Sequence, residues 1–138
     1  MNTTHLERHN YGYRRQTSLD LATAAEAVTA ALKEEGFGVL MTLDLQGTLR
    51  QKLGVERPPY TILGACNPAL ANEALNADPE IGLLLPCNVV VYADADGGTV
   101  VSAIDPETLF AVVRRDDLAS LAQEVGVRLR RALERLPA

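Results

Sequence analysis

Two short stretches decide the fold of this 138-residue chain: Gly64-Ala65-Cys66-Asn67-Pro68 and Leu85-Pro86-Cys87-Asn88-Val89. Each places a cysteine directly before an asparagine, and together they hold both cysteines of the chain. In the first stretch, Asn67 suits a helix N-cap and Pro68 suits the first helical position. A strand therefore ends there and a helix begins, and the second stretch lies at the next strand.

The N-terminal part of the chain predicts a strand and then a helix. Tyr11 and Tyr13 alternate with other residues, which indicates a strand over residues 10–16 with the tyrosine rings on one face. The segment Thr17–Asp20 offers a hydroxyl N-cap with a carboxylate in the first turn. Apolar residues then recur at three- and four-residue steps until Gly36, which ends the helix.

Three segments connect this helix to the stretch around Cys66. Residues 37–45 predict a strand with alternate side chains on one face, namely Phe37, Val39, Met41 and Leu43. Residues 46–57 are ambiguous, but Leu45, Leu49 and Leu53 at four-residue steps fit a short amphipathic helix that Gly47 interrupts and Gly54 closes. Pro58-Pro59 then favours an extended approach to a short strand over 60–65.

After Cys66, the helix that starts at Pro68 is followed by further strands. The runs 81–85 and 89–93 predict strand on either side of Pro86, with a bulge at Pro86-Cys87 that re-aims the cysteine. A turn over residues 94–98 connects to a returning strand at 99–104.

The C-terminal segment predicts a long amphipathic helix capped by Asp116 or Asp117. Two long helices, each with one apolar face, need a shared surface to bury it. An antiparallel sheet with both helices on one face provides that surface. We therefore expect an α+β fold, in one domain over residues 10–138, behind a flexible terminus over residues 1–9.

Composition excludes several classes of protein. Thirteen basic and 18 acidic residues give a net charge of −5, which argues against a nucleic-acid partner. No apolar run approaches the roughly 20 residues that span a bilayer, so no membrane role is expected. The N-terminus lacks the apolar block of a secretory signal, and two cysteines suit a reducing compartment, so we expect a cytoplasmic protein.

The two cysteines are the main candidates for a functional site. If their thiols converge beside the start of the helix at Asn67, the helix end favours a thiolate or a bound anion. The alternative is that both are small, buried core residues. Asn67 and Asn88 are either cap and turn residues or ligand contacts, and Asp105 is either a turn residue or a site carboxylate.

Other chemistry has less support. The only histidines, His5 and His9, lie near the terminus, so we expect no metal site, and no pair of residues suits acid–base or Cys-His catalysis. The sequence does not identify a cofactor. Arginines on one face of the last helix form either a solvated face or a surface for an anionic partner, namely Arg128, Arg131 and Arg135.

A family resemblance covers nearly the whole chain, from about Tyr11 to Leu136. The block Tyr60–Pro68, then Ala71, then the block Ile81–Val89 resemble the pattern of the domain of unknown function 302 family. Glu34–Val39 and Asp105-Pro106 also stand where that pattern places them.

This resemblance implies a strand, a helix, four antiparallel strands and a final helix, similar to half of the TATA-binding-protein fold. It also implies a homodimer, but it implies no activity, and likeness to a DNA-binding fold is no reason to expect DNA binding.

Three hypotheses for function follow. The first is a domain that binds a small ligand or anion at Cys66, Asn67, Pro68, Cys87, Asn88 and Asp105. The second is thiol redox or sulfur-carrier chemistry, with Cys66 as nucleophile and Cys87 as the resolving thiol. The third is a structural or interaction module whose cysteines belong to the core.

Overall fold

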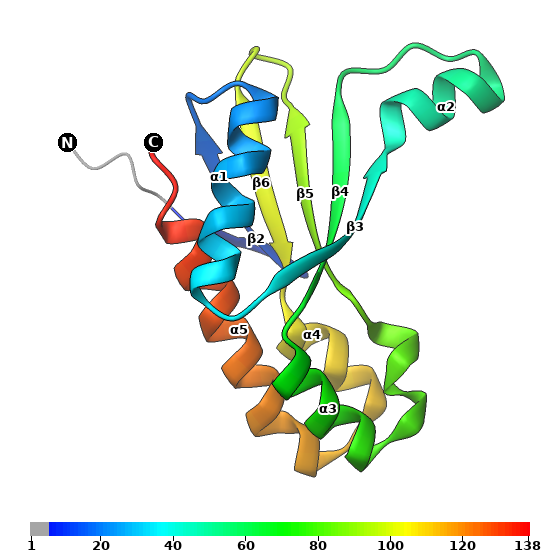
Figure 1. Ribbon diagram of the computed structural model, residues 1–138, viewed down its shortest axis with the longest axis vertical. Coiled ribbons are helices and arrows are strands. Elements are labelled where there is room, and N and C mark those ends of the chain that lie inside the picture. The colour runs from blue at the N-terminus through cyan, green and yellow to red at the C-terminus, as the bar shows by residue number, and fades with distance from the viewer. Residues whose placement is uncertain (1–5) are drawn as a thin grey trace.

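The computed structural model describes residues 6–138 as an antiparallel sheet with helices on one of its faces (Figure 1). The strands are β1 (Glu7–His9), β2 (Gly12–Thr17), β3 (Gly38–Asp44), β4 (Tyr60–Cys66), β5 (Cys87–Ala93) and β6 (Thr99–Ile104). The helices are α1 (Leu21–Glu34), α2 (Leu45–Leu53), α3 (Pro68–Ala77), α4 (Pro106–Phe110) and α5 (Ala119–Glu134). Short 3₁₀ turns are η1 (Pro79–Leu84), η2 (Ala111–Val113) and η3 (Asp116–Leu118).

The sheet has the strand order β1-β2-β6-β5-β4-β3, and every neighbouring pair is antiparallel. The predicted α+β class is therefore confirmed, while the likeness to half of the TATA-binding-protein fold stays a prediction. Of the terminus expected to be flexible, residues 1–5 lie outside the described residues and Glu7–His9 form β1. Within residues 6–138, no helix is long and apolar enough to cross a membrane.

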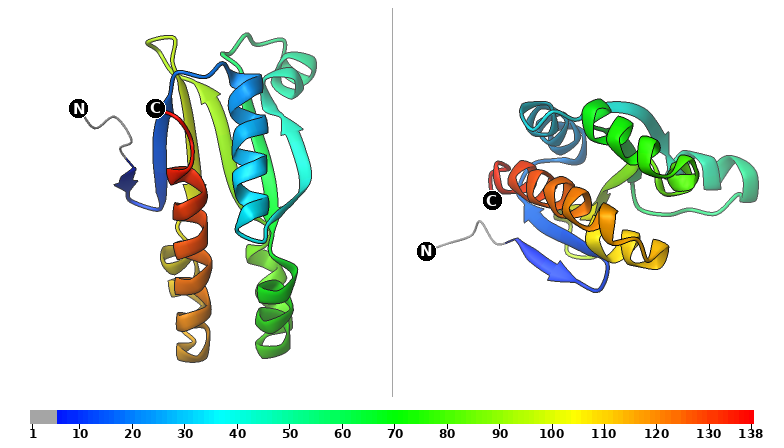
Figure 2. Two further views of the ribbon diagram at one scale, coloured as in Figure 1. Left: turned by 60° about the vertical axis from the view of Figure 1, so that its left-hand side comes forward. Right: turned by 90° about the horizontal axis from the view of Figure 1, so that it is seen from below.

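The main core lies between the sheet and the two long helices, α1 and α5, which cover the same face (Figure 2). Alternating strand residues point into this core because successive strand side chains point to opposite faces. Its fully buried members include Ala24, Val28, Leu32, Val89, Val91, Val101, Leu129 and Leu133. The opposite face of the sheet carries no helix and is called the open face below (Figure 2).

A smaller apolar cluster lies at the end of the sheet, where α3, η1, α4 and the first turns of α5 meet (Figure 1). Ile81, Phe110 and Leu118 are its largest buried members. α5 belongs to both clusters, because Ala122 packs in the small one and Leu129 and Leu133 pack in the main one.

Two helix caps differ from the prediction. α1 is capped by Asp20, whose carboxylate accepts a hydrogen bond from the Thr23 backbone N–H at 2.8 Å, and not by Thr17 or Ser18. α5 has no side-chain cap, so neither Asp116 nor Asp117 fills that role. Asp117 instead pairs with Arg115, which explains why its carboxylate does not face the helix end.

The predicted strand over residues 81–85 is wrong, because Ile81 to Leu84 belong to η1. Asp78 caps that turn by accepting from the Glu80 backbone N–H at 3.0 Å, and a short apolar run does not distinguish a turn from a strand. Pro86 consequently precedes β5 and is no strand bulge. Its ring lies against Gly64, where a Cβ atom would be 2.9 Å from Pro86 Cγ.

A bulge lies in β3 instead, where the register shifts between Val39 and Met41. The extra residue transfers the following side chains to the other face of the sheet. Met41 and Leu43 are therefore exposed, at 57% and 44%, while Phe37 is buried, so the prediction that all of them share one face is wrong. A similar correction applies to Tyr11, which precedes β2 and is exposed, whereas Tyr13 is buried.

Candidate functional site

The Cys-Asn-Pro junction, defined as Cys66, Asn67, Pro68 and Cys87, lies where β4 and β5 meet α3. Asn67 caps α3, because its Oδ1 accepts a hydrogen bond from the Leu70 backbone N–H at 3.2 Å. Cys87 begins β5 opposite Ala65 of β4, which places it on the helix-covered face. The predicted helix start at Asn67-Pro68 is confirmed.

Both cysteines line one apolar cavity of about 30 Å³, closed by residues from α3, α4 and α5. Its walls include Leu70, Ala74 and Phe110. A volume of this size is enough for about one water molecule, whereas small-molecule sites occupy roughly 300–1,000 Å³. The cavity at the junction therefore has no room for an organic ligand.

Cys87 is buried, with only 7% of the residue exposed. Burial, and to a smaller extent the neighbouring Cys66, raise the pKa of Cys87 to about 11. Because the thiolate is the reactive form, such a thiol is a poor nucleophile near neutral pH. This environment is typical of a structural cysteine and does not suit Cys87 as a resolving thiol.

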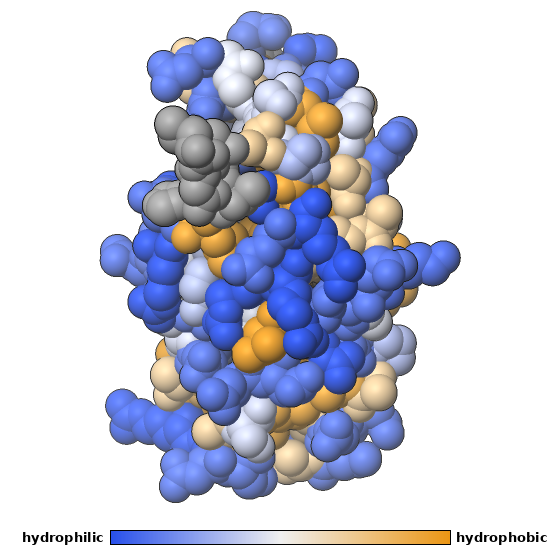
Figure 3. All heavy atoms as spheres, turned by 90° about the vertical axis from the view of Figure 1, so that its left-hand side faces the viewer, coloured by the Kyte–Doolittle hydropathy of each residue, from blue (hydrophilic) through white to orange (hydrophobic). Residues whose placement is uncertain are grey.

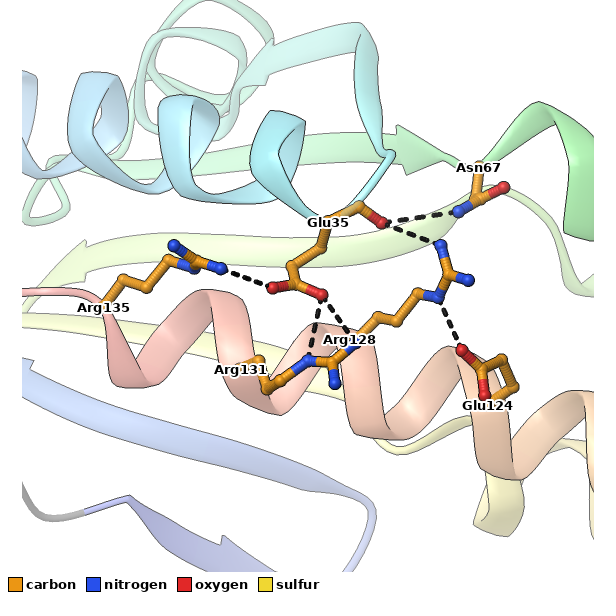
Figure 4. Close-up of polar contacts among 6 residues, drawn as sticks. All are labelled: Glu35, Asn67, Glu124, Arg128, Arg131 and Arg135. Carbon is orange, nitrogen blue, oxygen red and sulfur yellow. Dashed lines mark hydrogen bonds and ion pairs between the residues drawn. The ribbon is translucent and has the colours of Figure 1, made fainter.

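Beside the junction, Glu35 gathers donors from α3 and α5 (Figure 4). Its carboxylate accepts hydrogen bonds from Arg131 Nε at 3.0 Å and Arg135 Nη2 at 2.8 Å. Its backbone carbonyl accepts from Asn67 Nδ2 at 3.5 Å and Arg128 Nη1 at 3.4 Å. This Glu35 cluster ties the end of α1 to the start of α3 and to α5.

The Glu35 side chain is only 6% exposed. Burial alone would raise its pKa, but the hydrogen bonds and charges of Arg135 and Arg131 outweigh that effect, so its pKa lies below the ordinary 4.5. The sequence predicted a solvated arginine face or a surface for an anionic partner. The structure instead provides the anion within the chain, and Arg128 additionally pairs with Glu124.

Gly36 makes this cluster possible. Its φ of +87° is in the left-handed region that favours glycine, as expected for the residue that ends α1. A Cβ atom at Gly36 would also lie 2.9 Å from Asn67 Nδ2. The position thus needs glycine for two reasons, its backbone angle and the close passage of the Asn67 side chain.

Asn88 does not join the junction. It follows Cys87 along β5, so it points to the opposite, open face of the sheet, where it is exposed. There it lines a hollow of about 340 Å³, called the open-face hollow. The lining residues are His9, Tyr11, Gly12, Arg14, Tyr60, Asn88, Val90, Tyr92, Ser102, Ala103 and Ile104.

One side of the open-face hollow is built around Gly12. A Cβ atom there would lie 2.8 Å from His9 Nε2, so glycine leaves the space that the imidazole ring occupies. His9 Nε2 lies 3.3 Å from Ser102 Oγ, within hydrogen-bond distance. The same ring meets Tyr11 edge to face, with ring centroids 5.2 Å apart.

The other side of the open-face hollow is a pair of tyrosines from neighbouring strands. Tyr60 and Tyr92 are opposite each other in the β4–β5 register, and their rings stack with centroids 5.3 Å apart and planes 12° apart. Burial, with smaller contributions from Tyr92 and Tyr11, raises the pKa of Tyr60, so its hydroxyl stays a donor at neutral pH. Arg14, held by Glu7 at 2.8 Å, adds a guanidinium to the rim.

Asp105 is among the lining residues of neither the junction cavity nor the hollow. It caps α4, accepting from the Glu107 backbone N–H at 3.0 Å and the Thr108 hydroxyl at 2.9 Å, and it pairs with Arg8 at 2.8 Å. Burial opposes ionisation, but the bonds from Thr108 and Arg8 outweigh it and lower the pKa of Asp105. The carboxylate thus fixes the β6–α4 connection and β1.

The predicted site residues therefore separate into three places. Cys66, Asn67, Pro68 and Cys87 come together, while Asn88 lies on the open face and Asp105 lies at α4. Among residues 6–138, no group of three or more His, Cys, Asp and Glu side chains could hold a metal ion.

Sequence reasoning missed Glu35 and the tyrosine pair. Glu35 looked like an ordinary helix-end residue, and only the spacing of arginines along α5 gave a signal for its partners. Tyr60 and Tyr92 become neighbours through the β4–β5 register, and a connection containing a helix and a turn does not reveal that register in the sequence.

Comparisons with known proteins agree on one family. The family model described as domain of unknown function DUF302 matches residues 13–136. A crystal structure of an uncharacterized conserved DUF302 protein from Bacillus stearothermophilus is similar, with 31% identity and a TM-score of 0.87. That similarity covers 93% of this chain and 99% of the other. Among curated proteins, none matches this sequence.

Proposed function

Because this chain belongs to the DUF302 family, whose description names no activity, we propose a function from its own geometry: it binds a small planar molecule in the open-face hollow. The observation that carries this proposal is the stacked Tyr60–Tyr92 pair beside polar groups in a hollow of about 340 Å³. That volume lies within the range of small-molecule sites.

The chemistry of the lining indicates the ligand class. Tyrosine faces attract flat π systems, which prefer offset or edge-to-face arrangements. Asn88 and Ser102 offer hydrogen bonds, and Arg14 offers a cation at the rim that would recognise a carboxylate. A planar aromatic carboxylate combines these features.

This proposal places the ligand away from the cysteines. The junction cavity of about 30 Å³ is too small for such a molecule, so of the residues first considered only Asn88 takes part. The thiol alternative has weaker support, because the pKa of Cys87 is raised to about 11.

Tyrosine fluorescence tests the proposal directly, because the chain has four tyrosines and no tryptophan, and Tyr11, Tyr60 and Tyr92 line the hollow. Titration with nicotinate or benzoate should change the emission saturably. Cyclohexanecarboxylate, which has the same charge but no planar ring, should have no saturable effect at equal concentration.

Two variants complete this test. Tyr92→Leu should weaken benzoate binding at least about tenfold, since stacking of a planar ring, such as a nucleic-acid base, on one aromatic side chain contributes on the order of 1–3 kcal/mol. Tyr13→Phe should leave it unchanged, because Tyr13 lies on the helix-covered face. The proposal fails if neither planar probe binds, or if Tyr92→Leu binds benzoate as well as the unmodified protein does.

A further inference from the structure

Among the residues that line the open-face hollow, His9 is the one whose side chain type ordinarily gains or loses a proton near neutral pH. The residue is half-buried, Gly12 leaves room for its ring, and the ring meets Tyr11 edge to face. β1, which carries His9, ends the sheet on the side of the molecule that carries both termini, and that side is mostly hydrophilic (Figure 3). His9 can therefore exchange a proton with solvent while its neighbours hold the ring in place.

The sheet register places His9 beside the group that would hold a ligand carboxylate. Arg14 is directly opposite Ser102 in the β2–β6 register. Side chains of directly opposite residues are neighbours on one face of a sheet, with Cβ atoms roughly 5 Å apart. His9 Nε2 in turn lies 3.3 Å from Ser102 Oγ. A carboxylate that contacts both Arg14 and Ser102 therefore comes within reach of the imidazole ring.

The charged groups around His9 pair with one another. Glu7 on β1 favours the protonated ring and Arg14 on β2 opposes it, but these two groups form an ion pair at 2.8 Å, so their effects on the ring largely cancel. Arg8 and Asp105 also pair at 2.8 Å. The other titratable side chains that line the hollow are those of Tyr11, Tyr60 and Tyr92. A bound carboxylate would thus add a negative charge that these pairs do not supply.

We propose that planar aromatic carboxylates bind in the open-face hollow together with one proton, which His9 takes up from solvent. The protonated imidazole carries a charge and donates from both nitrogens, so it can donate a charge-assisted hydrogen bond to the carboxylate. The carboxylate in turn stabilises the protonated ring, because the coupling between two bound partners is reciprocal. This inference rests on the proposed function and adds that the affinity of the hollow for its ligand rises as the pH falls.

Benzoate titrations at pH 8 and pH 6, followed by tyrosine emission, test the inference. Benzoate stays ionised over this range, so a change in its affinity reports a change in the protein. The dissociation constant should fall at least about threefold from pH 8 to pH 6, as expected for one added charge-assisted hydrogen bond at a partly exposed site. Benzamide, which has the same ring but no charge, is the matched probe, and its affinity should be equal at both pH values.

Two histidine variants assign the effect to a residue. His9→Gln keeps a hydrogen-bonding side chain that takes up no proton in this range, so it should bind benzoate with equal affinity at pH 8 and pH 6. His5→Gln is the control, because His5 is the only other histidine of the chain and lies outside the described residues. It should retain the threefold change. Circular dichroism compares the fold of both variants with that of the unmodified protein.

Calorimetry of benzoate binding to the unmodified protein needs no variant. The difference between the binding heats in two buffers with different heats of ionisation counts the protons taken up, and we expect net uptake at pH 7. Equal affinity at both pH values without proton uptake would overturn this inference and leave the proposed function intact. A pH dependence that survives His9→Gln, or that is lost in His5→Gln, would also overturn it. Absence of benzoate binding at either pH would overturn both.

Discussion

The Cys-Asn-Pro junction and the open-face hollow lie on opposite faces of the same strand, because Cys87 and Asn88 are neighbours in β5. At the junction, Asn67 and Glu35 have partners within the chain, and the cavity holds about one water molecule. The hollow is more than ten times larger and presents rings, an amide and a guanidinium to solvent. The two cysteine stretches thus mainly build the fold, whereas the residues that line the hollow lie outside those stretches, apart from Asn88.

We expect the largest effect on stability at the junction from Gly36→Ala. A Cβ atom there combines an unfavourable φ with a contact of 2.9 Å to Asn67 Nδ2. We expect a loss of about 3 kcal/mol in the free energy of unfolding, more than a hundredfold in the equilibrium constant. Urea unfolding followed by circular dichroism measures this loss.

Gly54→Ala provides the control for Gly36→Ala. Gly54 has a similar φ of +69° but no atom within 4 Å of its would-be Cβ, so this variant should lose only about 1 kcal/mol. Equal losses of unfolding free energy in the two variants would show that the close approach of Asn67 adds nothing to the cost of a side chain at position 36.

Alkylation of Cys87 tests whether the junction is chemically inert. A pKa of about 11, against 9.0 for an ordinary thiol, reduces the thiolate fraction at pH 8 by about a hundredfold. Iodoacetamide should therefore modify Cys87 about a hundred times more slowly in the folded protein than in urea, as peptide mass spectrometry can follow. Similar rates in both states would restore the thiol hypothesis.

Glu35→Gln should cost about 1.5 kcal/mol, roughly tenfold in the unfolding equilibrium. The Glu35 carboxylate is nearly buried, but Arg131 and Arg135 are about half exposed. Solvent therefore reduces the stability that each of these two ion pairs contributes. Glu124→Gln removes only an exposed pair with Arg128 and should cost less than about 0.5 kcal/mol. A smaller loss for Glu35→Gln than for Glu124→Gln would contradict the role of the Glu35 cluster.

The same residue predicts a pH dependence. Because folding lowers the pKa of Glu35, its carboxylate contributes stability above pH 4.5, and that contribution is lost as the pH falls through the lower pKa of the folded state. Unfolding free energies measured between pH 7 and pH 3 should therefore fall less steeply for Glu35→Gln than for the unmodified protein. Parallel curves would contradict this assignment.

Asn88→Ala should have the smallest effect on folding. Because Asn88 is exposed, the unfolding free energy of the variant should differ from that of the unmodified protein by less than about 0.5 kcal/mol, roughly twofold in the equilibrium constant. Benzoate binding, however, should weaken, since the amide lines the hollow. A large loss of stability with unchanged binding would reverse the contrast between the two faces.

Local signals in the sequence predicted much of the fold. The Asn67-Pro68 helix start, the Gly36 stop and the strand at 99–104 depend on neighbouring residues alone and are confirmed. The strand at 81–85 was wrong because Asp78 and Pro79 begin a 3₁₀ turn that an apolar run does not reveal.

The candidate site was harder to predict, because it depends on contacts between distant parts of the chain. His9 reaches Ser102 across 93 positions, and Glu35 reaches Arg131 across 96. A single sequence shows residue types and spacing along one element, whereas these pairs depend on the order of strands in the sheet.

The bulge at Leu40 has a consequence for how this protein stays in solution. Edge strands with exposed apolar side chains are templates for uncontrolled strand addition, and a bulge interrupts the regular row of backbone donors and acceptors that such growth requires. β3 is therefore a poorer template for strand addition, even though Leu40, Met41 and Leu43 are exposed. The bulge that turns Met41 and Leu43 to the open face thus also interrupts the backbone pattern that a further strand would need at this edge.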